Sequence, residues 1–379
     1  MGNCVASGLE GVIAADTVLS SVDGERGRLI LRGHALEALA GVETFEGVCG
    51  LFLDGALPEP SERVALGEAL ARGRVRAFEH VEQSPTLLGS RDGMAALRMA
   101  LASLECEDPL EITASVGVFA AAWSRLRRGL APVPPDPDRG HAADTLRMVA
   151  GVPAHRAAVE ALECYWVTVV DHGMNASTFT ARVVASTGSD RVSAVVAAIG
   201  ALKGPRHGGV PGPVLDMLDA IGTPQRAQSW LAREIAAGRR IMGMGHRVYR
   251  VRDPRAAVLE AALGRLEASG TRGERLALAR HVEGMALELL RERHPDRRLE
   301  ANVEFYTAVL LEAVGLPRPA LTPMFAAARV VGWLAHFDEQ ARTGRLIRPL
   351  ARYVGSLPGP RNRGLPSSSK RCSDSIPTS

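Results

Sequence analysis

The sequence predicts an all-α protein that contains many helices and one small β-hairpin near its N-terminus. Apolar residues make up 46% of the 379 residues, but aromatic residues only 4%, while alanine, leucine and arginine are abundant. This composition favours helices, because sheets depend on valine, isoleucine, tyrosine and phenylalanine. From residue 45 onward, apolar residues also recur at helical spacing between capping residues and glycines.

The N-terminal segment 12–32 is the exception to this helical pattern. Two runs rich in apolar residues, 12–19 and 28–31, flank a turn that contains Gly24 and Gly27. Two such runs around a glycine-containing turn are typical of a hairpin, so we expect one here.

Caps, stops and periodicity define the helices. Ser61 and Asp92 are placed to cap helices, and Gly55 and Gly73 are placed to end them. Residues 131–140 are rich in proline, which removes helical hydrogen bonds, so we expect a loop there. The predicted helices are, in chain order, 45–54, 61–72, 93–104, 154–170, 177–187, 191–202, 213–221, 225–237, 254–268, 273–293, 302–314 and 323–343.

Charge and cysteine content exclude several classes of protein. The formal net charge is +3, and the basic residues after residue 355 account for this excess. A nucleic-acid-binding protein concentrates basic charge on its folded part, so we expect no nucleic-acid partner. The sequence has no apolar run of membrane-helix length and no signal-peptide pattern, so we expect no membrane association. Five scattered cysteines suit a reducing cytoplasm, and no histidine–cysteine cluster has the spacing of a metal site.

Three glycine-containing breaks between helices each carry a histidine. They are residues 171–178 with His172, 203–209 with His207 and 243–255 with His246. Imidazole exchanges protons near neutral pH, and glycine lets the backbone approach a ligand closely. Each break can also be read as an ordinary turn, and in the first of them Ser177 would then be a helix cap.

The third break favours an anionic ligand. Its histidine is followed by Arg247, Arg250, Arg252 and Arg255, and guanidinium groups match carboxylates and phosphates. A dinucleotide fingerprint is excluded, because the third glycine is missing and no strand precedes the glycines.

The three breaks, in this order, resemble the signature segments of the citrate synthase family. Residues 302–306, Asn-Val-Glu-Phe-Tyr, resemble a fourth segment, residues 8–12 and 29–33 resemble the start of bacterial members, and residues 322–349 resemble their end. The resemblance extends over residues 8–355.

This resemblance implies an acyltransferase that condenses acetyl-CoA with oxaloacetate and hydrolyses citryl-CoA to citrate and CoA. It implies that His207 hydrogen-bonds the thioester oxygen and that Glu304 removes a methyl proton. His246 would donate to the ketone of oxaloacetate as the carbon–carbon bond forms. These are general acid–base and oxyanion-stabilising roles. Acetyl-CoA is a substrate, so no cofactor is expected.

The resemblance also implies substrate-binding residues. Arg255 and Arg329 correspond to arginines that bind carboxylates, and Arg348 corresponds to one that reaches the active site of the neighbouring subunit. The other implied contacts are His172, Asn175 and Ser177 for the substrates, and Arg250, Gly204 and Gly243 for CoA.

The family fold implies two helical domains and a homodimer. The large domain would comprise residues 1–205 and 315–355, the small domain residues 206–314, and residues 356–379 would form a disordered tail. The active site would lie in a cleft that closes over the substrates. The small apolar residues of helix 191–202 predict close packing, either within the core or against a second subunit.

Glu304 departs from the family pattern, in which the best-known members carry aspartate. The extra methylene lengthens the reach by about 1.5 Å. This departure leaves open a weakly active or non-catalytic relative. A 2-methylcitrate synthase, which uses propionyl-CoA in the same site, also stays open, because one methylene is worth only about 1–3 kcal/mol in a hydrophobic pocket.

Overall fold

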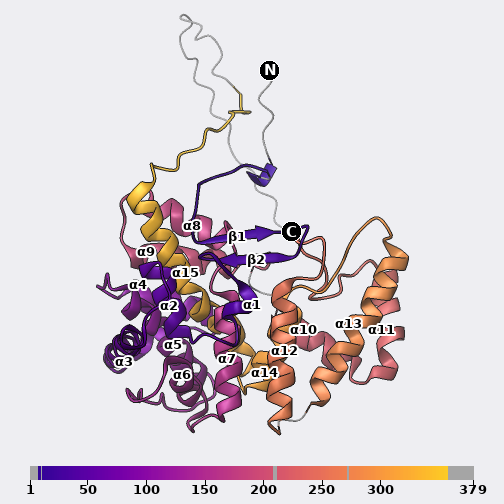
Figure 1. Cartoon of the computed structure of the whole chain (residues 1–379), viewed down its shortest axis with the longest axis horizontal. Helices are drawn as coiled ribbons and strands as arrows, with labels where there is room; N and C mark the ends of the chain where they lie inside the picture. The colour runs from indigo at the N-terminus through magenta and orange to yellow at the C-terminus, as the bar shows by residue number, and fades with distance from the viewer. Residues whose placement is uncertain (1–6, 10, 208–210, 271–272, 357–379) are drawn as a thin grey trace, which may run out of the picture. The chain divides into compact units, whose positions relative to one another are not determined.

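The computed structural model describes residues 7–9, 11–207, 211–270 and 273–356 (Figure 1). The chain divides into two compact units, residues 1–346 and residues 347–379. In the second unit, the described residues 347–356 are irregular, and Tyr353 Oη donates to the carbonyl of Ser356 at 2.9 Å. The tail predicted to be disordered lies, apart from Ser356, outside the described residues. The division of residues 1–355 into two domains stays a prediction.

The all-α prediction is confirmed. The described residues form fifteen α-helices, which are coloured in chain order in Figure 1. The helices are α1 Leu36–Leu39, α2 Phe45–Asp54, α3 Pro60–Gln83, α4 Gly93–Ala102, α5 Pro109–Leu126, α6 His141–Ala150, α7 Arg156–Val169, α8 Ala176–Ala185, α9 Arg191–Leu202, α10 Pro211–Ile221, α11 Pro224–Ala236, α12 Pro254–Ala268, α13 Glu274–Arg293, α14 Val303–Ala313 and α15 Leu321–Thr343. Among them, none has both the length and the apolar character needed to cross a membrane.

The predicted N-terminal hairpin exists, but its first strand was placed wrongly. Strand β1 is Ser20–Asp23, and it pairs antiparallel with β2, Arg28–Leu31, so that Ser20 lies opposite Leu31. A short third strand, β3 (His34–Ala35), pairs with β2. The apolar run 12–19 precedes the sheet, because a strand that pairs with β2 across a short turn must directly precede that turn.

Helix α3 is twice as long as predicted, because it continues through Gly73 to Gln83. Glu59, not Ser61, is the N-cap, and it forms a capping box with Glu62. Gly73 lies inside the helix, where a Cβ would be 2.9 Å from Ala114 Cβ of α5. The glycine therefore allows α3 and α5 to pack closely rather than ending the helix.

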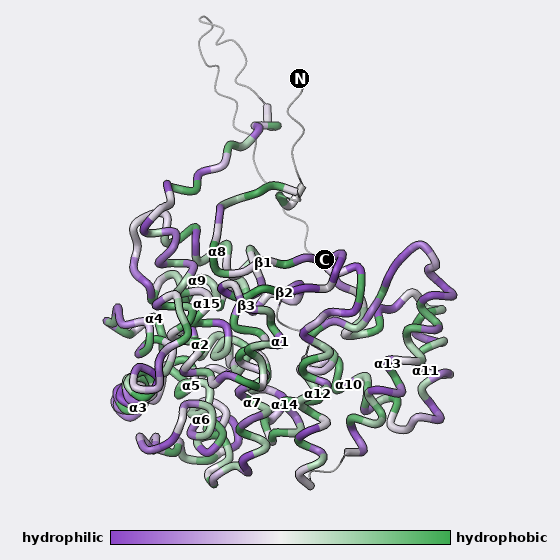
Figure 2. The backbone as a smooth tube through the Cα atoms, viewed as in Figure 1, coloured by the Kyte–Doolittle hydropathy of each residue, from purple (hydrophilic) through white to green (hydrophobic). Residues whose placement is uncertain are grey.

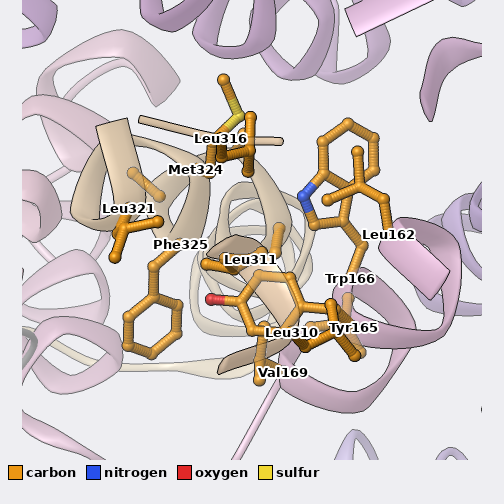
Figure 3. Packing of buried hydrophobic residues seen from close by; sticks show 14 of the residues in the cluster. Leu162, Tyr165, Trp166, Val169, Leu310, Leu311, Leu316, Leu321, Met324 and Phe325 are labelled. Atoms are coloured by element: carbon orange, nitrogen blue, oxygen red, sulfur yellow. The ribbon is translucent and has the colours of Figure 1, made fainter. Parts of the chain in front are cut away.

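Helix α15 runs through the hydrophobic core. Most of its side chains from Leu321 to Phe337 are buried, and it packs against α5, α7, α8 and α9. Figure 3 shows Met324 and Phe325 of α15 near Tyr165 and Trp166 of α7 and Leu311 of α14. The outer helices α11 and α13 instead alternate green and purple in Figure 2, as expected for helices with one buried face.

Candidate active site

The structure brings the first and third histidine-bearing breaks together. The rings of His172, after α7, and His246, before α12, are 5.6 Å apart between centroids and nearly perpendicular. Tyr249 contacts both histidines. Its Oη lies 3.1 Å from His172 Nε2, and its ring centroid is 4.8 Å from that of His246.

The backbone fixes the proton of His246 on one ring nitrogen. Its Nδ1 accepts hydrogen bonds from the backbone N–H groups of Val248 at 2.9 Å and Tyr249 at 3.0 Å. A nitrogen that accepts two hydrogen bonds carries no proton, so the ring proton lies on Nε2. Burial, reinforced by the nearby charge of Arg255, lowers the pKa of His246 to about 4. His246 is therefore a neutral hydrogen-bond donor at neutral pH.

His207 is oriented by the first turn of α8. Its Nε2 accepts from the backbone N–H of Ser177 at 3.3 Å and lies 2.8 Å from Ser177 Oγ. This places the ring proton of His207 on Nδ1. Trp333 of α15 donates through Nε1 to Ser177 Oγ at 3.1 Å, and Ser177 Oγ lies 2.8 Å from Asn175 Oδ1. Burial, followed by the charge of Arg329, lowers the pKa of His207 to about 4.

Asn175, not Ser177, caps helix α8. Its Oδ1 accepts from the backbone N–H of Thr178 at 3.1 Å. The reading of Ser177 as a helix cap is therefore wrong, because the helix begins one residue before it. This placement leaves the hydroxyl of Ser177, which is fully buried, available to His207.

Arg255 is held by a neighbouring carboxylate. Asp253 caps α12 and accepts from Arg255 Nε at 3.0 Å and from Nη2 at 2.7 Å. Asp253 Oδ2 also accepts from the backbone N–H of Val303 at 3.1 Å, which ties α12 to the start of α14. Arg255 Nη2 lies 3.4 Å from His246 Nε2. The guanidinium is thus fixed beside the histidine.

Arg329 is the second buried arginine of the site, with 1% of its surface exposed. Its Nε donates to the carbonyl of Val169, and its guanidinium lies 4.9 Å from the ring centroid of Phe325. Within the described part of the chain, no carboxylate lies at ion-pair distance from it. Burial lowers the pKa of Arg329 to about 10. A buried cation without a carboxylate partner favours an anionic ligand.

Glu304 lies in the first turn of α14, after the N-cap Asn302, whose Oδ1 accepts from the backbone N–H of Glu304 at 3.0 Å. The carboxyl oxygen Oε2 is buried and has no hydrogen-bond partner. Burial raises the pKa of Glu304 to about 7, although Arg255 and Arg329 act in the opposite direction. Glu304 is thus a more basic carboxylate than an exposed glutamate.

The site as a whole favours anions. Burial, followed by the charges of Arg255, His246 and Arg329, holds the pKa of His172 well below its usual range. The same two arginines act on Glu304, so the carboxylate, the arginines and the histidines share one electrostatic environment.

The remaining predicted residues are Arg250, Gly204 and Gly243 in the first unit and Arg348 in the second. Arg250 is exposed on the His246 loop, and Gly204 forms a turn at the end of α9 through a hydrogen bond to the carbonyl of Ala201 at 3.1 Å. The carbonyl of Gly243 accepts from the backbone N–H of Asn302 at 2.9 Å. Arg348 belongs to the second unit, where its side chain is exposed.

Sequence reasoning missed three residues that hold the site together. They are Asp253, Tyr249 and Trp333. Asp253 could have been found, because an Asp-Pro pair before an apolar run is a helix-start signal. Tyr249 and Trp333 could not, because their contacts join segments that are far apart in the sequence.

Comparison with known proteins decides the family. Residues 8–350 match the family described as Citrate synthase, C-terminal domain. The chain belongs to the citrate synthase family. Its relatives include the citrate synthase of Haloferax volcanii, which is 36% identical over 375 residues that cover 92% of this chain and 95% of the relative. They also include the 2-methylcitrate synthase of Mycobacterium tuberculosis, 35% identical over 376 residues that cover 94% of this chain and 93% of the relative.

A solved structure of the citrate synthase family has the same fold. The ternary complex of carboxymethyl coenzyme A and oxaloacetate with citrate synthase from Thermoplasma acidophilum matches with a TM-score of 0.83 and 28% identity. The match covers 94% of this chain and 97% of that one. The predicted family and fold are both confirmed.

Proposed function

We propose that this chain condenses acetyl-CoA with oxaloacetate and hydrolyses the resulting citryl-CoA to citrate and CoA. One observation carries the proposal. A buried carboxylate, Glu304, has a pKa of about 7 and shares its environment with two buried arginines and a neutral histidine that donates through Nε2. This set can bind a dianion, remove a proton from carbon and protonate a forming alkoxide.

Arg255 and Arg329 bind the carboxylates of oxaloacetate. Arg255 is pre-oriented by Asp253, while Arg329 gains a carboxylate partner only when substrate is bound. His172, held by Tyr249 Oη, contacts the same substrate, and Asn175 and Ser177 lie beside it. Bound charge is stabilised more strongly here than in water, because the arginines are buried.

Glu304 is the base that removes a methyl proton from acetyl-CoA. A base works best when its pKa is near the operating pH, and burial brings the pKa of Glu304 to about 7. His207 donates through Nδ1 to the thioester oxygen and so stabilises the enol. The base and the enol stabiliser come from different elements, α14 and the segment after α9.

His246 completes the condensation. As the methylene carbon of the enol attacks the ketone carbon of oxaloacetate, the Nε2 proton of His246 passes to the ketone oxygen. The product is citryl-CoA, and water then cleaves its thioester to give citrate and CoA thiol. The two backbone donors stay on Nδ1 during this transfer, because they stabilise the negative charge that the imidazole ring carries once its Nε2 proton has left.

The proposal extends to assembly and to CoA. A homodimer in which Arg348 serves the neighbouring active site is supported by the family, and a cytoplasmic enzyme of the tricarboxylic acid cycle fits the same family. Arg250, Gly204 and Gly243 are proposed to lie along CoA, and two domains are proposed to close over the site. Each of these statements is a prediction for this chain.

A coupled assay tests the activity. Purified protein is mixed with oxaloacetate and either acetyl-CoA or propionyl-CoA, and released CoA thiol is measured together with the acid product by mass spectrometry. We expect citrate from acetyl-CoA. The absence of both thiol release and citrate would contradict the proposal and would favour a non-catalytic relative.

The second candidate is a 2-methylcitrate synthase, which the relative of that name in Mycobacterium tuberculosis favours. The two substrates differ by one methylene, which is worth only about 1–3 kcal/mol in a hydrophobic pocket. A kcat/KM for propionyl-CoA above that for acetyl-CoA would establish the second candidate in place of the first.

A further inference from the structure

Strand β1 touches the His172 loop at one end. Ser20 Oγ donates to Asp171 Oδ2 and accepts from the backbone N–H of Gly173 at 2.9 Å. Asp171 is fully buried, and its Oδ1 lies 3.3 Å from His336 Nε2 of α15. The residues on both sides of His172 are therefore attached to one side chain of β1.

The turn after β1 touches the His246 loop. The carbonyl of Gly24 accepts from the backbone N–H of Arg250 at 2.9 Å. A Cβ on Gly24 would lie 2.3 Å from the carbonyl oxygen of Val248, the residue whose N–H donates to His246 Nδ1. The turn thus contacts the backbone that orients His246.

Gly24 is glycine because of this contact and not because of its backbone conformation. It is not among the residues with positive φ, so alanine would adopt its conformation without strain. The neighbouring atom is a backbone oxygen, which cannot rotate away like a side chain. With alanine at position 24, the His246 loop must move by about 1 Å to reach ordinary van der Waals contact.

We propose that β1 and its turn, residues 20–24, are a positioning element that sets His246 relative to His172. Gly24 and Ser20 are positioning residues, since neither contacts the reacting atoms. The inference rests on the proposed function and adds to it the element that aligns two histidines from separate loops. Displacement of a catalytic group by about 1 Å costs about 10²-fold in rate. A shift of His246 by this distance would therefore lower the rate measurably.

Gly24→Ala tests the contact, and Glu25→Ala is its matched control. Glu25 is the next residue, and its side chain is exposed. For Gly24→Ala we expect kcat to fall by about 10²-fold, with the Kd for oxaloacetate changed less than threefold, because Arg255 and Arg329 stay in place. Glu25→Ala should match the unchanged protein. A kcat for folded Gly24→Ala within twofold of the unchanged protein would overturn the proposal.

A double-substitution cycle separates positioning from a merely structural role. If Gly24 acts through His246, then Gly24→Ala should lower kcat no further in a His246→Ala background. Equal losses of kcat in both backgrounds would show that Gly24 acts elsewhere and would overturn the proposal.

A spectroscopic readout keeps the proposal testable without turnover. In protein labelled with ¹⁵N-histidine, the Nδ1 and Nε2 shifts of His246 report which nitrogen is protonated. Gly24→Ala should change these shifts and Glu25→Ala should not. If the ¹⁵N shifts of His246 in Gly24→Ala equal those of the original protein, the inference is contradicted. This test does not need turnover. A failure of the original protein to make citrate would count against the proposed function only.

Ser20→Ala tests the other end of β1, with Ser21→Ala as its control. Ser21 is on the same strand, but its side chain is exposed. Loss of the Ser20 hydroxyl frees the His172 loop, so we expect the KM for oxaloacetate to rise by about 10-fold, equivalent to about 1.4 kcal/mol. A KM within twofold of the unchanged protein would refute this half of the inference, and this variant serves even if Gly24→Ala fails to fold.

Discussion

Ser177 Oγ lies 2.8 Å from His207 Nε2, although the two residues are 30 positions apart in the chain. The same hydroxyl accepts from Trp333 Nε1 of α15 and lies 2.8 Å from Asn175 Oδ1. Three elements therefore meet at one buried serine, whose hydroxyl contacts the ring of His207.

Replacement of this serine should impair turnover more than stability. In Ser177→Ala, His207 keeps only the backbone N–H of residue 177, and Trp333 loses its acceptor. We expect kcat to fall by about 10–10²-fold, with a loss of about 1–3 kcal/mol in the free energy of unfolding. Steady-state kinetics and urea unfolding measure the two effects. The control is Ser229→Ala, where an exposed hydroxyl bonds only to the preceding turn; equal kinetics in the two variants would contradict the role of Ser177.

The two buried arginines should differ in their effect on stability. Arg255→Gln leaves the buried carboxylate of Asp253 without its ion-pair partner, which should cost about 3–5 kcal/mol in unfolding free energy. Arg329→Gln removes a cation that has no carboxylate partner among the described residues, so the loss should be clearly smaller. Both variants should weaken oxaloacetate binding by at least about 10²-fold. Thermal unfolding and calorimetry test this, and equal destabilisation by both would contradict the difference.

Stability should increase with pH between about 4.5 and 6.5. His207 and His246 have pKa values of about 4 in the fold, and that of His172 is lower than usual, so the unfolded chain binds more protons in this range. Glu304 has a raised pKa and therefore lowers stability as the pH rises, but its effect is outweighed by that of the three histidines. Away from the site, the pKa of His141 is lowered and that of Glu163 is raised, so their contributions to the pH dependence of stability offset each other.

Urea unfolding at pH 4.5, 5.5 and 6.5 measures this slope. His207 and His246 each contribute on the order of 2 kcal/mol across the range, so His246→Gln should flatten the curve by about that amount. A slope that is unchanged in His246→Gln would show that His246 is not held neutral by the fold.

Hybrid dimers test the role of Arg348. Arg348→Ala and His207→Ala should each be inactive alone, but a mixed dimer contains one site with neither substitution if Arg348 acts across subunits. Mixing after subunit exchange should therefore restore up to about a quarter of the activity, with exchange verified by native mass spectrometry. No recovery after verified exchange would contradict a shared site.

Local signals predicted most of the helices, although not α5 and α6, but they did not predict the contacts between elements. Asp92 caps α4 as its spacing indicates, because a cap depends on neighbours in sequence. Gly73 misled the prediction, since its role depends on α5. The histidines and arginines of the site were recognised from motifs, whereas Tyr249 and Trp333 act only through tertiary contacts. The first strand was misplaced because apolar content alone does not define pairing register.

We expect that aspartate cannot replace Glu304 without a loss of turnover. The backbone around it is fixed by the Asn302 cap and by Asp253, which accepts from the neighbouring Val303 N–H. In Glu304→Asp the carboxylate withdraws by about 1.5 Å, and we expect kcat to fall by about 10²-fold. A higher kcat in Glu304→Asp would contradict this prediction and would show that aspartate is the better base at this position.

Glu304→Gln tests the central claim most directly, by exchange of the methyl protons of acetyl-CoA. The protein is incubated in D₂O with acetyl-CoA and malate, a dicarboxylate without a ketone to attack, and deuterium uptake is followed by mass spectrometry. The variant should remain folded and should be more stable than the unchanged protein above pH 7, because burial disfavours the charged carboxylate. Oxaloacetate should still bind. The account predicts deuterium uptake with the unchanged protein and none above background with Glu304→Gln, and uptake at a near-normal rate in the variant would contradict it.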